Sequence, residues 1–221
     1  MKRTMMKTIP LYALALCAFP TFAAPYVGVG YALGYAQQDQ NIRFNEQPSS
    51  KLDPNLEDGI ASLFAGYTLS PSWAIELGYR QYDLDDSHTA NLGTVNQGGK
   101  DYYHSKEWDA SVDAKQVYLA PVWRYQLSEK WQGQIKAGLT YTQYQASQSL
   151  DNELELITND DIEINNRLEH QSKDHNQFGG LVSVGVAYQL MPQWFVGGDV
   201  QYQADSFAQV TAINLATRYQ F

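Results

Sequence analysis

Apolar residues alternate with small or polar ones along eight separate stretches of this 221-residue chain. Over residues 27–35, for example, the odd positions are Val, Val, Tyr, Leu and Tyr, and the even positions are Gly, Gly, Ala and Gly. Successive side chains of a β-strand point to opposite faces, so this period indicates strands with one apolar face. Every charged residue in the eight stretches falls on the other face. We therefore expect an all-β fold of eight strands.

Three similar segments, residues 69–73, 127–131 and 190–194, join these stretches in pairs. Each segment ends one alternating stretch and opens the next, which predicts a tight hairpin turn. The segments begin 58 and 63 residues apart, so short connections must alternate with long ones. This asymmetry is typical of barrels that cross a membrane. We expect an eight-stranded antiparallel transmembrane β-barrel with short periplasmic turns and three long extracellular loops.

A soluble β-sandwich would also alternate, so the composition of the second face is decisive. That face is mostly Gly, Ala, Ser, Thr and Gln with few charges, which suits the crowded interior of a small barrel. Aromatic residues gather near the short turns, as they do where a barrel meets the membrane interface. The predicted periplasmic aromatic girdle is Trp73, Trp131, Trp194, Tyr219 and Phe221. Pro121 lacks an amide donor and predicts a bulge or a weakened ladder in its strand.

Residues 1–23 begin with basic residues, continue with an apolar stretch over 9–19 and end in Ala23. This order predicts a secretory signal peptide, followed by a barrel domain over residues 24–221. The apolar stretch is too short to span a bilayer as an anchor, and Leu16 is unsuited to precede a lipidated Cys17. Loss of the three basic residues in this segment would leave 12 basic against 24 acidic residues. A net charge of −12 disfavours binding to nucleic acid.

These features, with the ending Tyr219-Gln220-Phe221, resemble those of the OmpA/OmpX-type family of small outer-membrane β-barrels. The resemblance covers residues 24–221. It implies the outer membrane of a Gram-negative bacterium, with outer-membrane lipid and lipopolysaccharide as partners, and we expect a monomer. In that family, alternate apolar residues before a terminal Phe imply recognition by the barrel-assembly machinery. Tyr219 and Phe221 match this assembly signal, whereas Thr217 departs from it.

Six charged residues occupy inward positions of the predicted strands. An eight-stranded barrel is barely wide enough for its own side chains, and an unpaired charge there would be costly. We therefore expect a network with Glu76 near Arg124, Asp199 near Arg218, and the other two charges one layer higher. Such a network either plugs the lumen or gates a narrow ion path. The predicted lumen charge network is Glu76, Arg80, Arg124, Lys136, Asp199 and Arg218.

The acidic residues are concentrated in the three long connections. Residues 37–58, 83–113 and 146–176 have net charges of −3, −5 and −6. Two interpretations remain open: a solvated, self-repelling surface, or carboxylates that hold divalent cations against lipopolysaccharide phosphates. Neither acidic cluster, 83–86 or 160–163, has the ligand spacing of a calcium loop, so we predict no metal site and no cofactor. Alternation around residues 154–164 predicts a hairpin that protrudes beyond the membrane.

A lipid A-modifying enzyme would need a Ser, His and acid set at the outer rim. A Ser and an Asp near two of the histidines do not establish triad geometry, and we expect no enzymatic activity. The sequence instead favours a structural or surface-interaction role, including adhesion to a host or surface ligand, through the acidic loops. A narrow channel for small or apolar solutes is the alternative. The histidines, all in the long connections rather than on strands at the lipid boundary, are His88, His104, His170 and His175.

Overall fold

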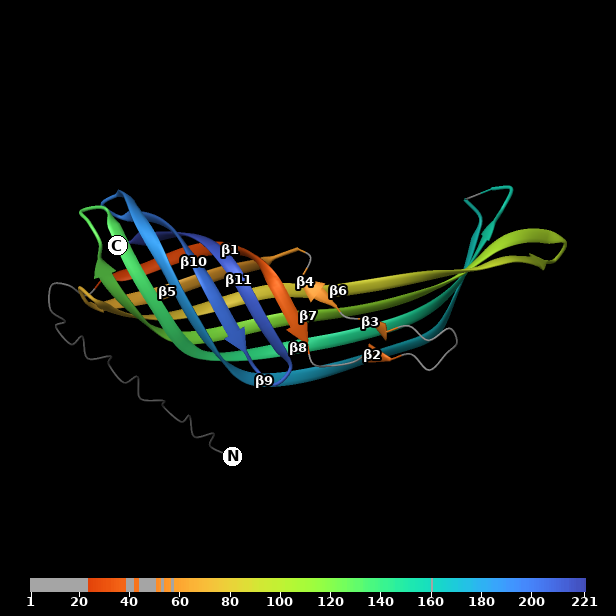
Figure 1. Cartoon of the computed structure of the whole chain (residues 1–221), viewed down its shortest axis with the longest axis horizontal. Helices are drawn as coiled ribbons and strands as arrows, with labels where there is room; N and C mark the ends of the chain where they lie inside the picture. Colours follow the sequence, from red (N-terminus) through yellow and green to blue (C-terminus); the bar gives the residue numbers. More distant parts are fainter. Residues whose placement is uncertain (1–23, 39–41, 44–50, 53, 57, 160) are drawn as a thin grey trace, which may run out of the picture.

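The computed structural model describes residues 24–38, 42–43, 51–52, 54–56, 58–159 and 161–221. The expected signal peptide, residues 1–23, lies outside the described residues, as do Asp160 and much of the first long connection. In the described part of the chain, no helix is long and apolar enough to cross a membrane. The chain is instead folded into strands from Pro25 onwards (Figure 1).

Eight long antiparallel strands form a closed ring. Each pairs with its two neighbours, β6 pairs with β7, and β1 pairs with β11, which closes the ring and leaves no free edge at this level. The all-β antiparallel barrel is therefore confirmed, with eight strands in the ring and the short strand β4 as a ninth member of the same sheet. Three two-residue strands lie in the first long connection: β2 (Ile42–Arg43), β3 (Lys51–Leu52) and β4 (Asn55–Leu56). The strands of the ring are β1 (Pro25–Gln38), β5 (Ile60–Ser70), β6 (Trp73–Gln97), β7 (Lys100–Gln126), β8 (Trp131–Leu156), β9 (Glu163–Met191), β10 (Trp194–Ala204) and β11 (Ala208–Gln220).

The outward face of the ring is the apolar face that the alternation predicts. Leu139 of β8 is 74% exposed and Phe178 of β9 is 80% exposed. Thr140, the next residue of β8, points to the other face and is buried inside the ring. Side chains this large and apolar would not be left in water over a whole ring surface, so lipid is the solvent of this face. We call this surface the lipid-facing belt.

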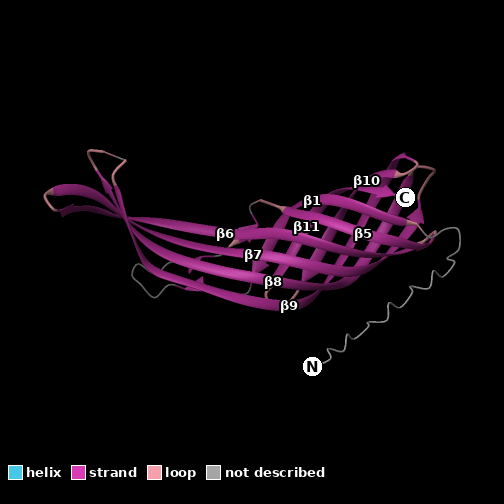
Figure 2. Ribbon diagram, turned by 180° about the vertical axis from the view of Figure 1, so that it is seen from behind, coloured by secondary structure: helices cyan, strands magenta, loops and turns pink. Residues whose placement is uncertain are grey.

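The short connections β5–β6, β7–β8 and β9–β10 all lie at one end of the barrel, as predicted (Figure 2). The aromatic residues of the expected girdle lie at this end and point outward. The Trp194 and Tyr219 rings lie 5.1 Å apart, and the Tyr219 and Phe221 rings lie 5.0 Å apart. At Pro121 the predicted weakening is present without a bulge: Leu119 and Val122 pair with β8 in one continuous register, and the two residues between them do not.

Two of the long connections consist of strand rather than irregular loop. Strands β6 and β7 continue beyond the ring through residues 83–113, and β8 and β9 continue through 146–176. These four strands form one sheet that extends a single side of the barrel wall (Figures 1 and 2). We call these residues the extension. The hairpin predicted around 154–164 is confirmed, with Leu154 opposite Ile164.

The sequence of the extension predicts its strands only weakly, because its outward face is mostly polar and its apolar residues are few and far apart. Polar strands still pair when the strands of the ring have already set their register. Each backbone amide and carbonyl of the extension then lies opposite its partner on the neighbouring strand. The hairpin between β6 and β7 turns at Gly98 and Gly99, whose φ angles of 62° and 80° favour glycine. The glycine turn therefore ends β6 and begins β7, although the hydrophobic pattern does not indicate these strand ends.

Candidate functional site

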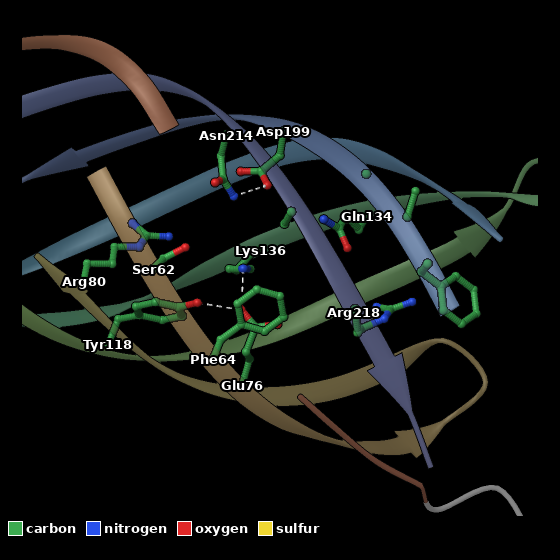
Figure 3. Close-up of a pocket in the computed structure, with 14 residues that line it drawn as sticks. Ser62, Phe64, Glu76, Arg80, Tyr118, Gln134, Lys136, Asp199, Asn214 and Arg218 are labelled. Carbon is green, nitrogen blue, oxygen red and sulfur yellow. Dashed lines mark hydrogen bonds and ion pairs between the residues drawn. The ribbon is translucent and has the colours of Figure 1, made fainter. Parts of the chain in front are cut away.

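The lumen contains a buried polar cluster centred on Glu76 of β6. Its carboxylate accepts hydrogen bonds from Tyr118 Oη at 2.8 Å and from Tyr26 Oη at 3.0 Å. It also forms an ion pair with Lys136 of β8. Glu76 is 4% exposed and Lys136 is 6% exposed. Four strands thus converge on one carboxylate, and Figure 3 shows the contacts from Tyr118 and Lys136. This cluster fixes the position of the barrel wall on several sides.

The ion pair differs from the expected one. Glu76 pairs with Lys136 rather than with Arg124, and Lys136 does not lie one layer higher. Glu76 lies opposite Ala120 of β7 in the sheet register, and the small Ala120 side chain leaves room for Lys136 to reach across from the next strand. Arg124 donates instead to Thr68 Oγ1 at 3.2 Å and lies over the Tyr26 ring, 4.6 Å from its centre.

The second expected pair is also replaced by other partners. Asp199 accepts a hydrogen bond from Asn214 Nδ2 at 3.1 Å, its direct cross-strand neighbour. Arg218 donates to Gln132 Oε1 at 3.2 Å and packs over the Phe195 ring at 4.5 Å. The long Arg218 side chain therefore crosses the lumen from β11 to β8, because the shorter Asn214 already occupies the position beside the carboxylate.

Arg80 begins a chain of hydrogen bonds toward the outer end of the barrel. It donates to Gln201 Oε1 at 2.5 Å and to Gln203 Oε1 at 3.3 Å, and it lies over the Tyr118 ring at 4.6 Å. Gln203 donates in turn to the Tyr82 hydroxyl at 3.2 Å. Arg80 is thus held by amide oxygens and an aromatic face, and no carboxylate of the described residues forms an ion pair with it.

An apolar cluster fills the lumen above this chain. Tyr144 stacks on Phe207 with ring centres 4.4 Å apart, and Leu84 and Val112 are fully buried beside them. The Tyr144 hydroxyl donates to Asp205 in the β10–β11 turn at 2.8 Å. The outer mouth of the barrel is therefore closed by packed side chains.

Two cavities inside the ring that are lined by described residues are small. One, lined by Glu76, Lys136, Asp199 and Arg218 among others, has a volume of about 30 Å³ (Figure 3). A second, lined by Arg80 and Gln201 among others, has about 10 Å³. A single water needs roughly 10–15 Å³ measured in this way. The first cavity has room for about two waters and the second for one at most, so neither makes a pore for a solute.

A second aromatic ring lies at the opposite end of the lipid-facing belt and was missed at the sequence level. Tyr141 and Phe178 on neighbouring strands have ring centres 5.0 Å apart. Ten residues separate Trp131 of the periplasmic girdle from Tyr141 on β8. At about 3.3 Å per residue and a tilt of about 40°, this spans about 25 Å, the height of the apolar band of such barrels. The outward parity of Tyr35, Tyr79, Tyr141, Phe178 and Tyr202 was the signal that could have identified this ring.

The two faces of the extension differ in chemistry. On the face that continues the lumen, Trp108, Ala110 and Leu150 are buried under Leu52 of β3. Further out, Tyr102, Leu154 and Leu156 form another buried group, with Ile164 packed against it. The first long connection therefore covers part of this face, and apolar packing continues to the tip.

Carboxylates on the other face lie close to one another. Glu107 lies directly opposite Asp151, and Asp83 lies directly opposite Asp113. Partial desolvation, followed by repulsion from Asp109 and Asp151, raises the pKa of Glu107. Desolvation and repulsion from Asp151 likewise raise the pKa of Asp109. Like charges directly across a ladder are destabilising, so this face keeps its charge at some cost to its own stability.

The four histidines lie in the extension, as expected, but on its strands. His104 Nε2 lies 2.5 Å from Asn152 Oδ1, and the His88 and Trp108 rings are 5.8 Å apart. The His175 ring lies 5.4 Å from the Phe207 ring. Among the described residues, no group of three or more His, Cys, Asp or Glu side chains is arranged so that it could hold a metal ion.

Comparison with solved structures supports the fold. Neisserial surface protein A is 12% identical with a TM-score of 0.52, covering 90% of this chain and 99% of that one. The outer membrane protein OprG of Pseudomonas aeruginosa is 11% identical with a TM-score of 0.51, covering 90% and 96%. Ail, the attachment invasion locus protein of Yersinia pestis, in complex with the heparin analogue sucrose octasulfate, is 14% identical with a TM-score of 0.49, covering 90% and 99%.

A search of curated proteins by sequence gave no match. The family model described as the outer membrane protein beta-barrel domain matches residues 9–221. The closed ring, the lipid-facing belt and this match agree with one another. The chain therefore belongs to the outer membrane protein beta-barrel domain family and resides in the outer membrane of a Gram-negative bacterium.

Proposed function

We propose that this chain is a non-enzymatic surface-binding protein in which a sealed barrel anchors the extension and the tip of the extension binds a protein on another surface. The observation that carries the proposal is the extension itself, four hydrogen-bonded strands that project far beyond the belt. A rigid sheet loses little conformational entropy on binding, which favours recognition. A barrel that served only as an anchor would not need such a sheet.

The tip has the chemistry of a protein-binding surface. Val95 lies opposite Tyr102 on β6 and β7, and the Leu156 amide donates to the Ile162 carbonyl across the β8–β9 hairpin. Val95 is 38% exposed and Ile162 is 39% exposed at the edge of the buried group. On the other face, Tyr103 is 48% exposed. Both faces of the tip thus expose aliphatic or aromatic side chains, which is the chemistry of protein interaction sites.

The channel alternative receives less support from the lumen. The apolar cluster around Tyr144 and Phe207 closes the outer mouth, and the described cavities below it hold only one or two waters. Planar-bilayer recording of the refolded protein tests this point. We expect no steady conductance, and stable single-channel steps that disappear with Arg124→Ala would support a gated pore instead.

A tip variant tests the adhesive role. Val95→Ser, Tyr103→Ser and Ile162→Ser change only exposed side chains, so the barrel should fold and reach the surface normally. Bacteria that display this triple variant should adhere to cultured animal cells no better than bacteria without the protein. The matched control is Asn165→Ser, an exposed polar residue on the same part of β9. Full adhesion by the triple variant at equal surface amounts would refute the role of the tip.

A further inference from the structure

From the top of the belt into the extension, the paired positions on the outward face of the sheet have no apolar side chain over five successive cross-strand rows. Leu168, which the β9 register skips before the fifth row, is 45% exposed. The register aligns one residue of each of β6, β7, β8 and β9 in every row. None of these side chains is buried. From the belt outward the rows are Gln81, Lys115, Gln143 and Asn176; Asp83, Asp113, Gln145 and Asp174; Asp85, Ser111, Ser147 and Ser172; Ser87, Asp109, Ser149 and His170; and Thr89, Glu107, Asp151 and Arg167.

This polar face continues the lipid-facing belt without a break. Gln143 comes two residues after Tyr141 on β8, and Asn176 comes two residues before Phe178 on β9. Side chains two apart on a strand share a face. The five rows therefore rise directly above the outer aromatic ring, on the side of the sheet that points away from the barrel axis. The headgroup of a lipid that contacts the belt near its outer aromatic ring therefore lies beside these five rows.

The chemistry of the face is unlike that of a protein interface. The paired positions have no Tyr, Trp, Phe or Met, which are enriched where proteins bind one another. They offer hydroxyls, side-chain amides and carboxylates, which are the partners of sugar hydroxyls. The surface is also a regular sheet, so these groups are held in fixed rows rather than on mobile loops.

We propose that this polar face binds the saccharide part of the lipopolysaccharide whose acyl chains contact the lipid-facing belt. The argument for this occupant is continuity, since the outer leaflet places such saccharides at the height of the five rows. The inference is independent of the tip and of the proposed adhesive function. It assigns to the extension a second role, in which one face is fixed against the surrounding glycolipid.

The negative charge of the polar face means that this contact needs cations. The five rows hold seven carboxylates against Lys115 and Arg167, and lipopolysaccharide carries phosphate groups. Two negative surfaces repel unless cations lie between them. The described carboxylates do not form a complete metal site by themselves, so a divalent cation would be completed by phosphate oxygens from the lipid. The contact should therefore require Ca²⁺ or Mg²⁺.

Two adjacent residues on β9 give a matched test. Ser172 belongs to the polar face and Gln171 to the opposite face, and both are exposed. The sequence has a single cysteine, Cys17, in the expected signal peptide. In the chain from Ala24 onward, which has no other cysteine, Ser172→Cys and Gln171→Cys can therefore be labelled with a maleimide. Each variant is refolded into vesicles of phospholipid alone, of phospholipid with lipid A, or of phospholipid with lipopolysaccharide that has a complete core.

With complete-core lipopolysaccharide and Ca²⁺, labelling at Ser172→Cys should slow about tenfold, as expected when the local ligand exceeds its dissociation constant about tenfold. Labelling at Gln171→Cys should be unchanged. Lipid A alone should not protect Ser172→Cys, and protection by lipid A would show that the headgroup, not the saccharide, covers the face. Equal slowing at both positions would show crowding rather than contact and would overturn the proposal.

Charge reversal separates binding from the effect of a chelator on the membrane. In the wild-type background, a chelator should restore fast labelling at Ser172→Cys. With Asp113→Lys and Asp174→Lys added, the face meets phosphate directly, and protection should persist in the chelator. Protection that depends on Ca²⁺ to the same degree in both backgrounds would refute the cation-mediated contact. Tryptophan fluorescence and resistance to denaturation in SDS confirm that each variant is folded.

Discussion

Replacing Lys136 by methionine would leave the Glu76 carboxylate without its ion-pair partner while most of the side-chain volume is kept. Both residues are buried, and Glu76 would keep only the hydroxyl donors of Tyr26 and Tyr118. Removing one side of a buried ion pair costs about 3–5 kcal/mol. Hydrogen bonds to a charged group contribute about 1.5–3 kcal/mol each. Because two such bonds remain, we expect a loss near the lower limit, about 3 kcal/mol.

Urea unfolding in phospholipid vesicles, followed by tryptophan fluorescence, measures this loss. The double variant Glu76→Gln with Lys136→Met should lose about 2 kcal/mol less than the sum of the single losses, since no buried charge is left unpaired. The same cycle between Glu76 and Arg124 should give less than about half of that coupling, because attraction falls with distance. A Lys136→Met loss below about 1 kcal/mol, or equal coupling to Arg124, would refute the assigned pairing.

Three other predictions concern the extension and the barrel wall. Glu107→Gln should stabilise the extension by a few tenths of a kcal/mol, because Glu107 faces another carboxylate; unchanged amide hydrogen exchange would contradict this. The pKa values of Glu107 and Asp109 are raised above their usual 4.5 and 3.8, so the folded extension binds protons more tightly than the unfolded one. Its stability should be greatest below those usual values and fall as the pH rises through the raised ones; exchange at both ends of this range, corrected for intrinsic rates, measures the sign. Gly66→Ala would place a methyl group 2.1 Å from Tyr26 Cζ and should cost about 1–3 kcal/mol, whereas Gly180→Ala, with its nearest contact at 3.7 Å, should cost less than about 0.5 kcal/mol in the same urea assay.

The strands and their two faces could be predicted because strand geometry repeats every two residues. A shift of one residue would turn Val27 or Leu139 into the lumen and a charge into the lipid, so only one parity is compatible with a membrane. The inward position of Lys136 followed from the same rule. Parity therefore determined the lumen and the belt, and the short turns located the periplasmic girdle.

The partners inside the lumen could not be predicted in the same way. Parity says which side chains point inward, but contact across a barrel depends on strand tilt and on the volume of the residues between. Lys136 reaches Glu76 because Ala120 is small, and Asn214 takes the place beside Asp199 that was expected for Arg218. Both outcomes depend on the size of a neutral neighbour, which a count of charges does not consider.

The extension shows a different limit of sequence reading. Its polar residues predict connections rather than strands, because hydrophobicity is the main signal for a strand in a sequence. The alternation was nevertheless present, with Trp108 and Leu150 on one face and Asp109 and Ser149 on the other. The membrane-spanning strands have a continuous apolar outward face, whereas the outward face of the extension is mostly polar, so its strands lack the signal that identifies the others.

The seam of the ring determines the order in which the barrel can be completed. Strand β1 pairs along its length with β11, from Tyr26 opposite Gln220 to Gln38 opposite Ala208. These are the first and last of the eight strands, so the ends of the domain are joined only when the final strand arrives. Until then the sheet is an open ribbon with two unsatisfied edges, which hydrocarbon does not tolerate. Biogenesis of this protein must therefore protect both edges until the last strand is in place.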